Sequence, residues 1–237
     1  MKLIPVIDLM NGIVVRAIKG QRQSYLPSST PLCQSSQPEA VISALLSLYP
    51  FDTLYIADLD AITGRGSNIG IIGELSSMFQ ETLFWVDNGV QELQQLQTFA
   101  RPVIGTESLR SIEQLAHLVT SVPSPVLSLD YVDNRYRGPQ GLLDQPELWP
   151  DEVILMSLSH VGSAAGADTA RLQQLTPLLT THNLYAAGGI RDLQDLYQLQ
   201  GLGLSGALLS TALHQGSIDS QALSGFMADT FNPSICR

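Results

Sequence analysis

The chain has 237 residues, of which 44% are hydrophobic and 14% charged, so it can bury a sizeable core and is not a disordered protein. Its formal net charge of −10 and pI near 4.6 argue against a nucleic-acid partner, because phosphate backbones are bound by clusters of Lys and Arg. Lysine occurs only as Lys2 and Lys19, so an anionic substrate would be held by backbone N–H groups and by a few arginines, among which we expect Arg16.

The cysteines and the apolar runs indicate the cellular setting. Cys33 and Cys236 lie far apart and give neither a disulfide framework nor a CxxC metal pattern. No secretory pattern opens the chain, and no apolar run approaches the roughly 18 residues that a membrane span needs. We expect a cytoplasmic protein that acts on a phosphorylated small molecule, without membrane, metal or cofactor, as a monomer or small homo-oligomer.

Short apolar runs alternate along the chain with segments in which apolar residues recur every three or four positions. The predicted strands are 3–8, 53–58, 82–87, 101–105, 125–130, 152–159, 183–188 and 205–210. The predicted helices between them are 38–49, 69–79, 90–99, 107–119, 168–179 and 190–200. Because right-handed crossover helices join parallel strands, eight such units predict a (β/α)8 TIM barrel as a single domain over 1–237. An open doubly wound sheet is the alternative.

An internal repeat favours the closed barrel. The segment LFWVDNGV at 83–90 resembles NLYAAGGI at 183–190, since each is an apolar strand that ends in a Gly-bearing turn. Asp8 and Asp130 likewise end the first strand of each half. The chain therefore looks like two (β/α)4 half-barrels, about 1–122 and about 123–237.

Two stretches interrupt the alternation. Residues 20–38 are rich in Ser, Gln and Pro and follow a predicted hairpin at 12–20, and residues 131–150 occupy the matching place in the second half. Long loops in compact enzymes often act as lids. We expect 20–38 to be either a lid over a common site or disordered.

Asp8 and Asp130 are the predicted catalytic pair. In such a barrel the C-terminal ends of the strands surround one mouth, where the chemistry takes place. The first strands of the two halves would stand across the barrel, so the two carboxyls would act as acid and base; the alternative is that each caps a following turn. Asp58 and Asp60, after the second strand, either reach the mouth or have supporting and capping roles.

Glycine-bearing turns at the same rim predict phosphate sites, because backbone N–H groups can approach an anion there. The predicted contacts in the first half are Gly89, Gly105 and Thr106. Those in the second half are Gly188, Gly189, Ser210 and Thr211. Two such sites would suit an elongated, bisphosphorylated substrate, whereas the alternative is that the glycines only permit tight turns.

The motifs IPVIDLMNGIVVR, LYIADLDAI, VIGTESL, LSLD and AAGGIRDLQDL resemble the histidine-biosynthesis barrel family over nearly the whole chain. The chain looks closer to the phosphoribosylformimino-aminoimidazole-carboxamide ribotide isomerase than to the cyclase relative. The resemblance implies an Amadori rearrangement of an aldose-amine to a ketose-amine. Asp8 would be the base that moves the C2 proton and Asp130 the acid that opens the ribose ring, with no cofactor required.

The chain departs from the family pattern at the substrate-facing rim. Asp87 and Asn88 replace two glycines after the third strand, and a carboxylate near a phosphate is unfavourable, so that phosphate site would be lost or altered. Met156 stands at a threonine that assists catalysis in the family. The family's Asp-Gly-Thr turn becomes Val161, Gly162 and Ser163, of which Gly162 and Ser163 are expected to contact the substrate, and its Gly-Arg-Ala pattern becomes Ser210, Thr211 and Ala212.

Retention of both aspartates with a changed rim favours the same proton chemistry on a different substrate. We predict an isomerase-related enzyme of the intramolecular oxidoreductase type that acts on a phosphorylated sugar-amine or ribotide. The related branch suggests a setting in cofactor biosynthesis of one-carbon metabolism. The alternatives are an authentic histidine-pathway ribotide isomerase and a phosphometabolite-binding or partner-dependent barrel without catalysis.

Overall fold

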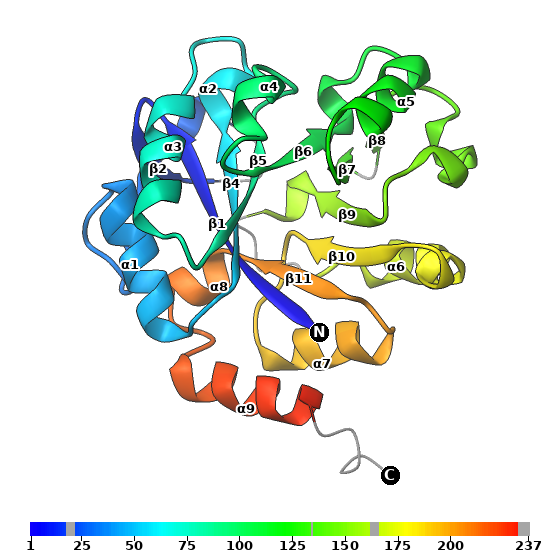
Figure 1. Ribbon diagram of the computed structural model, residues 1–237. Coiled ribbons are helices and arrows are strands. Elements are labelled where there is room, and N and C mark those ends of the chain that lie inside the picture. The colour runs from blue at the N-terminus through cyan, green and yellow to red at the C-terminus, as the bar shows by residue number, and fades with distance from the viewer. Residues whose placement is uncertain (18–21, 134, 162–165, 232–237) are drawn as a thin grey trace.

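The computed structural model describes residues 1–17, 22–133, 135–161 and 166–231, and in these residues parallel strands form a closed barrel that helices surround (Figure 1). The barrel strands are β1 (Lys2–Met10), β4 (Thr53–Asp58), β5 (Leu83–Asp87), β6 (Arg101–Gly105), β7 (Val126–Val132), β9 (Glu152–Ser157), β10 (Asn183–Ala187) and β11 (Gly206–Leu209). The last strand, β11, pairs with β1 and so closes the barrel. The predicted (β/α)8 barrel is confirmed, and an open sheet is excluded.

The helices pack on the outside of the barrel. They are α1 (Pro38–Leu48), α2 (Leu59–Ile62), α3 (Ile69–Met78), α4 (Leu93–Leu96), α5 (Ile112–Ser121), α6 (Thr169–Leu175), α7 (Leu193–Gly201), α8 (Thr211–His214) and α9 (Ser220–Phe231). The helix predicted at 90–99 is shortened to α4, because Val90 and Glu92 have positive φ values of 58° and 46° that a right-handed helix cannot contain. The helix predicted at 168–179 changes to 3-10 geometry next to Pro177, whose ring cannot continue an α-helix.

Short 3-10 segments supply most of the remaining connections. These are η1 (Arg22–Ser24), η2 (Thr106–Ser108), η3 (Leu142–Asp144), η4 (Pro146–Leu148), η5 (Leu158–His160) and η6 (Thr176–Thr180). Of these, η1, η2 and η5 lie at the C-terminal ends of the barrel strands and position side chains of the site described below.

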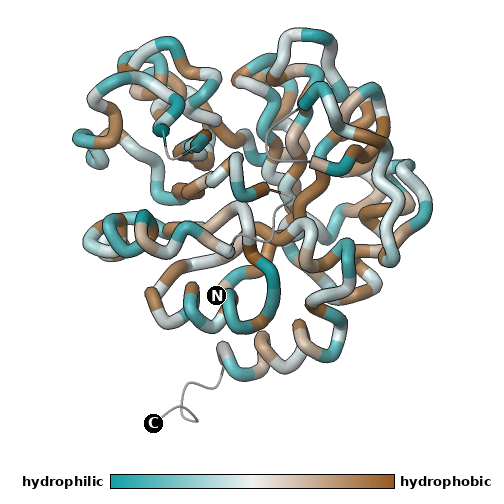
Figure 2. Tube along the Cα trace, turned by 180° about the vertical axis from the view of Figure 1, so that it is seen from behind, coloured by the Kyte–Doolittle hydropathy of each residue, from teal (hydrophilic) through white to brown (hydrophobic). Residues whose placement is uncertain are grey.

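Alternate residues of each strand pack on opposite faces of the barrel wall, so both faces are apolar. The outer face packs against the helices, and the inner face fills the barrel with one large residue from each strand: Ile4, Tyr55, Trp85, Val103, Val126, Ile154, Tyr185 and Leu208. The rings of Trp85 and Tyr185 meet edge to face with centroids 5.1 Å apart. Hydrophobic segments accordingly gather in the middle of the molecule (Figure 2). The barrel is therefore a packed core that is closed below its mouth.

Antiparallel strands extend the rim at two of the barrel strands. A hairpin forms where β2 (Ile13–Arg16) folds back on β1 through Asn11 and Gly12, with φ values of 52° and 78°, so it begins earlier than the predicted 12–20, of which 18–20 lie outside the described residues. A further strand, β3 (Leu26–Pro27), pairs with β2. In the second half, β8 (Arg135–Arg137) folds back on β7 in the same way.

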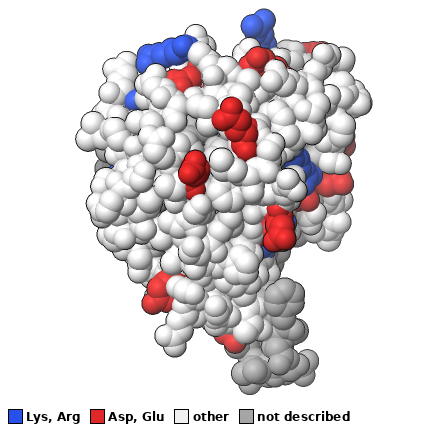
Figure 3. Space-filling view, turned by 60° about the vertical axis from the view of Figure 1, so that its left-hand side comes forward, with Lys and Arg blue, Asp and Glu red and all other residues white. Residues whose placement is uncertain are grey.

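Charged side chains are sparse on the molecular surface. On the face seen in Figure 3 they are scattered among uncharged residues, as expected for a chain with 14% charged residues. None of the described helices combines the length and the apolar character that a bilayer span requires.

Candidate active site

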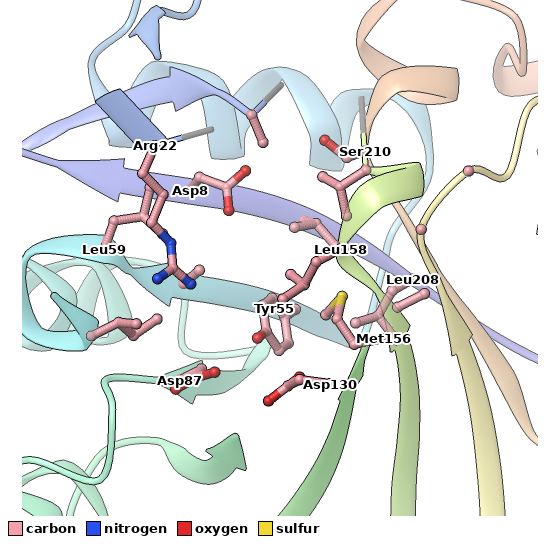
Figure 4. Close-up of a pocket in the computed structure, with 18 of the residues that line it drawn as sticks. Asp8, Arg22, Tyr55, Leu59, Asp87, Asp130, Met156, Leu158, Leu208 and Ser210 are labelled. Atoms are coloured by element: carbon pink, nitrogen blue, oxygen red, sulfur yellow. The ribbon is translucent and has the colours of Figure 1, made fainter. Parts of the chain in front are cut away.

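A cavity of about 170 Å³ opens at the C-terminal ends of the barrel strands. Four carboxylates and one basic side chain lie among the described residues that line it: Asp8, Asp87, Glu107, Asp130 and Arg22. Tyr25, Tyr55, Ser210 and Thr211 add hydroxyl groups, and the rest of the lining is mainly apolar. Figure 4 shows Asp8 and Arg22 on one side of the cavity and Asp87 and Asp130 on another.

Asp8 reaches the cavity because it continues the inward face of β1 after Ile4 and Val6. Its neighbour across the strand pair is the small residue Ala57 of β4, which leaves the carboxyl room at the mouth. Burial raises the pKa of Asp8 to about 7, although the nearby Arg22 guanidinium acts in the opposite direction. At neutral pH a substantial fraction of Asp8 is therefore ionised and able to accept a proton.

Asp130 continues the inward face of β7 after Val126 and Ser128. The Ser128 hydroxyl donates to its Oδ1 at 2.7 Å, and the backbone N–H of Glu107 donates to its Oδ2 at 3.0 Å. The Asp130 backbone N–H in turn donates to the Thr106 hydroxyl at 2.9 Å. Burial raises the pKa of Asp130 to about 8, helped by the negative charges of Asp87 and Glu107. Asp130 is therefore mostly protonated at neutral pH and fixed in orientation.

Asp87 is the inward residue at the end of β5, after Trp85, and its side chain lies beside Asp130 (Figure 4). Its Oδ1 accepts the N–H of Gly89 at 3.0 Å, and the Tyr55 hydroxyl also hydrogen-bonds to it. Burial is the main reason why the pKa of Asp87 rises to about 6. A third carboxyl therefore lies in the same site as the predicted pair.

In the first half of the chain, the end of β5 presents the Asp87 carboxyl to the cavity, where the family pattern has a glycine. Gly89 lies outside the cavity lining, its N–H is bound to Asp87, and a Cβ there would lie 2.8 Å from the Cα of Ile62. Gly105 lies between the side chains of Asp87 and Asp130, and Thr106 is fully buried behind Asp130. These three residues shape and support the acidic groups of the site.

The second-half turns differ, because Gly188, Gly189, Ser210 and Thr211 all line the cavity. Gly188 and Gly189 have φ values of 96° and 83°, and a Cβ on either would meet the backbone carbonyl oxygen of Ser157 or Gly166 at 2.4 and 2.2 Å. No other residue type fits these two positions. The backbone and hydroxyl groups predicted for a phosphate are therefore together on one side of the mouth.

Arg22 and Tyr55 complete the site, and neither is among the residues predicted from the sequence. Arg22 begins η1, within the stretch predicted as a lid or as disorder, and forms an ion pair with Glu107 from η2. Residues 20 and 21 of that stretch lie outside the described residues. Tyr55 shares the inward face of β4 with Ala57, so strand alternation could have identified it. No local signal in the sequence points to Arg22.

The other predicted residues lie elsewhere. Arg16 is exposed at the end of β2, where it borders a smaller neighbouring pocket instead of the main cavity. Gly162 and Ser163 lie outside the described residues. Asp58 caps α2 by accepting the Ala61 N–H at 3.2 Å, and Asp60 accepts the Asn11 N–H, so both have the supporting and capping roles that were one of the two alternatives.

Comparison with known proteins places the geometry in context. Residues 2–219 match the family model described as histidine biosynthesis protein. The chain is 31% identical over 233 residues to an uncharacterized protein of Methanocaldococcus jannaschii, covering 94% of this chain and 97% of that one. It is 27% identical over 239 residues, covering 93% and 96%, to the 1-(5-phosphoribosyl)-5-((5-phosphoribosylamino)methylideneamino) imidazole-4-carboxamide isomerase of Myxococcus xanthus. The isomerase of the same name from Nitrosopumilus maritimus is 28% identical over 236 residues, covering 92% and 96%.

Proposed function

The chain belongs to the histidine biosynthesis protein family, and from that premise we propose that it is an aldose-ketose isomerase that acts on a phosphorylated sugar-amine or ribotide. The observation that carries the proposal is the pair of carboxyls at the mouth of the barrel. Asp8 and Asp130 line one cavity from strands of the two halves. Burial raises the pKa of both, but their surroundings differ, because the Arg22 guanidinium lowers the pKa of Asp8 whereas the charges of Asp87 and Glu107 raise that of Asp130. Two carboxyls whose environments separate their pKa values can serve as base and acid.

In the proposed reaction Asp130 acts first, as the acid. It donates its proton to the ring oxygen while the bond from that oxygen to C1 breaks and the amine nitrogen forms an imine with C1. Asp8 then removes the proton from C2, which turns the protonated imine into an enolamine, and the enolamine gains a proton at C1 and loses the proton of the C2 hydroxyl to give the ketose-amine. A general base works best with a pKa near the working pH, and a general acid must be protonated there, which suits Asp8 and Asp130 in these roles.

Phosphate binding is proposed for the second half of the mouth only. The Gly188–Gly189 turn and the hydroxyls of Ser210 and Thr211 line that side, whereas the first-half side carries the carboxyls of Asp87 and Glu107. Asp87 also accepts the Gly89 N–H that would otherwise be offered to an anion. A phosphate dianion beside these carboxyls would be repelled. We therefore propose a substrate with one phosphate, whose other end is uncharged or cationic.

The test compares turnover of two substrates by the wild-type protein. One is the bisphosphorylated ribotide of the histidine pathway, followed by its ultraviolet change, and the other is a set of singly phosphorylated aldosyl-amines, followed by product analysis. The proposal expects turnover within the second set and little with the bisphosphate. Efficient turnover of the bisphosphate alone would instead identify an authentic histidine-pathway isomerase.

Two further outcomes would overturn the proposal. Binding of phosphorylated sugars without any turnover would identify a phosphometabolite-binding barrel. Turnover that appears only when a co-purifying protein is added back would identify a partner-dependent subunit.

A further inference from the structure

Two buried carboxyls converge at the end of β6, where Gly105 has no side chain. A Cβ built on Gly105 would lie 2.9 Å from Oδ2 of Asp87 and 3.2 Å from Oδ2 of Asp130. The carboxyls come from β5 and β7, the two neighbours of β6 in the barrel. The absence of a side chain at residue 105 therefore lets them approach across the intervening strand.

The Oδ2 atom of each group faces this gap, and that of Asp130 also accepts the Glu107 N–H at 3.0 Å and the Thr106 hydroxyl at 3.4 Å. Oδ1 of Asp87 accepts the Gly89 N–H, and Oδ1 of Asp130 accepts the Ser128 hydroxyl. Both of these oxygens are fixed by a donor of the protein. The two Oδ2 atoms are the side-chain atoms nearest the position that a Gly105 Cβ would occupy, and Figure 4 shows the Asp87 and Asp130 side chains next to each other.

The surrounding charges do not neutralise both carboxylates. Asp87 faces Arg22, Tyr55 and Glu107, and Arg22 is already ion-paired with Glu107. Asp130 faces Glu107 and Asp87, with the neutral hydroxyls of Tyr55 and Tyr136 nearby. Two carboxyls within about 6 Å of each other in a buried site cannot both be ionised without a large cost in free energy, so one of the two keeps its proton.

We infer that Asp87 is a positioning residue that holds one proton jointly with Asp130 across the gap at Gly105, so that Asp130 is ready to donate at neutral pH. Sharing of the proton is a property of the substrate-free protein, whereas its delivery to a ring oxygen rests on the proposed function. The arrangement would explain why a carboxyl stands at position 87 in a site that must protonate its substrate. The pKa values of about 6 and about 8 for Asp87 and Asp130 agree with a coupled pair.

The test is a carbon-13 NMR titration of the aspartate carboxyl carbons in the intact, substrate-free chain. In the wild type the Asp87 and Asp130 signals should each show two steps, because each carbon senses the ionisation of the other group. In Asp87→Asn the midpoint of Asp130 should fall by about one pH unit or more, whereas in Asp130→Asn the main step of Asp87 should stay in place, because Asp130 is still neutral when Asp87 ionises. Asp144→Asn removes an exposed carboxyl and should leave both midpoints unchanged.

Single-step titrations in the wild type, together with an Asp130 midpoint that Asp87→Asn does not move, would overturn the inference. The wild-type curves decide the question even if a variant fails to fold. Since no substrate is present, the result is independent of whether the proposed isomerase activity is found. Once a substrate is known, Asp87→Asn should also move the alkaline limb of kcat/KM to lower pH, whereas a purely structural defect would lower the rate at every pH.

Discussion

Arg22 and Glu107 form an ion pair at the mouth of the barrel, although they are 85 positions apart in sequence. Arg22 belongs to η1, which follows the first-half hairpin, and Glu107 belongs to η2, which follows β6. The pair joins the segment after β2 to the acidic side of the cavity. The ion pair also places Arg22 between Asp8 and Asp87. Arg22 is the one basic side chain among the described residues that line the cavity.

Replacing Arg22 should change the ionisation of the proposed base. The Arg22 guanidinium lowers the pKa of Asp8 against the effect of burial, so Arg22→Gln should raise that pKa further above about 7. The acidic limb of kcat/KM, or the Asp8 carboxyl titration by NMR, should move to higher pH. Arg65→Gln, which removes an exposed arginine, is the control. An Asp8 midpoint that stays the same in both variants would show that Arg22 does not act on the base.

The turn after β10 should tolerate no side chain. Gly188→Ala places a Cβ 2.4 Å from the Ser157 carbonyl oxygen at a φ of 96°, so it should lower the free energy of unfolding by about 2 kcal/mol or more. Gly64→Ala is the matched control, because Gly64 also has a positive φ, 66°, but its Cβ would meet nothing within 4 Å. Urea unfolding measures the free energy of unfolding of both variants. Equal losses in the two variants would show that the contact with Ser157 contributes nothing.

A buried amide should be needed to hold the two aspartates after β4. The Asn68 side-chain N–H groups donate to Asp58 at 2.7 Å and to Asp60 at 2.9 Å, and its oxygen accepts the Gly12 N–H at 3.0 Å. Asn68→Ala removes these three hydrogen bonds, leaves the Gly12 N–H without this acceptor, and should cost about 2 to 3 kcal/mol of unfolding free energy. Gln80→Ala, which removes an exposed amide, should cost less than about 0.5 kcal/mol. A small loss at Asn68 would contradict this account of the network.

The carboxyls of the cavity should make stability fall as the pH rises. The pKa values of Asp8, Asp87 and Asp130, about 6 to about 8, lie above the roughly 3.9 of an unfolded Asp, so the contribution of these three groups is fully present below about pH 4 and is lost between about pH 4 and 8. The difference in unfolding free energy between Asp87→Asn and the wild type should therefore move in favour of the variant by roughly 2 kcal/mol when the pH is raised from 5 to 8.

Thermal or urea unfolding at the two pH values measures this gain. Asp144→Asn should show the same stability difference from the wild type at both. A gain of the same size in both variants would mean that general surface charge, and not the cavity, is responsible.

Much of the fold follows from strand patterns that the sequence displays directly. Each barrel strand is buried on both faces and reads as an apolar run, and Asp8 and Asp130 continue the inward faces of their strands, so both were predicted at the mouth. The same alternation would have placed Asp87 after Trp85 and Ala57 after Tyr55. In the sequence alone Asp87 stands out only as a change in a phosphate turn, although its strand position puts it beside Asp130.

The rest of the site depends on long-range contacts that no local pattern encodes. Arg22 reaches the cavity through the β2–β3 pairing and its ion pair with Glu107, in a stretch whose composition suggested a lid or disorder. Arg16 is closer to Asp8 in sequence, but it stands at the exposed end of β2. The role of Gly105 is likewise visible only when the side chains on both neighbouring strands are placed.

The measurement that tests the central claim most directly is kcat for wild type, Asp8→Asn and Asp130→Asn on the best phosphorylated sugar-amine. If Asp8 is the base and Asp130 the acid, each variant should lose about three orders of magnitude or more in kcat and still bind the phosphorylated substrate. Asp144→Asn should retain the wild-type rate. Turnover within a few-fold of wild type in either active-site variant would contradict the assignment of the acid-base pair.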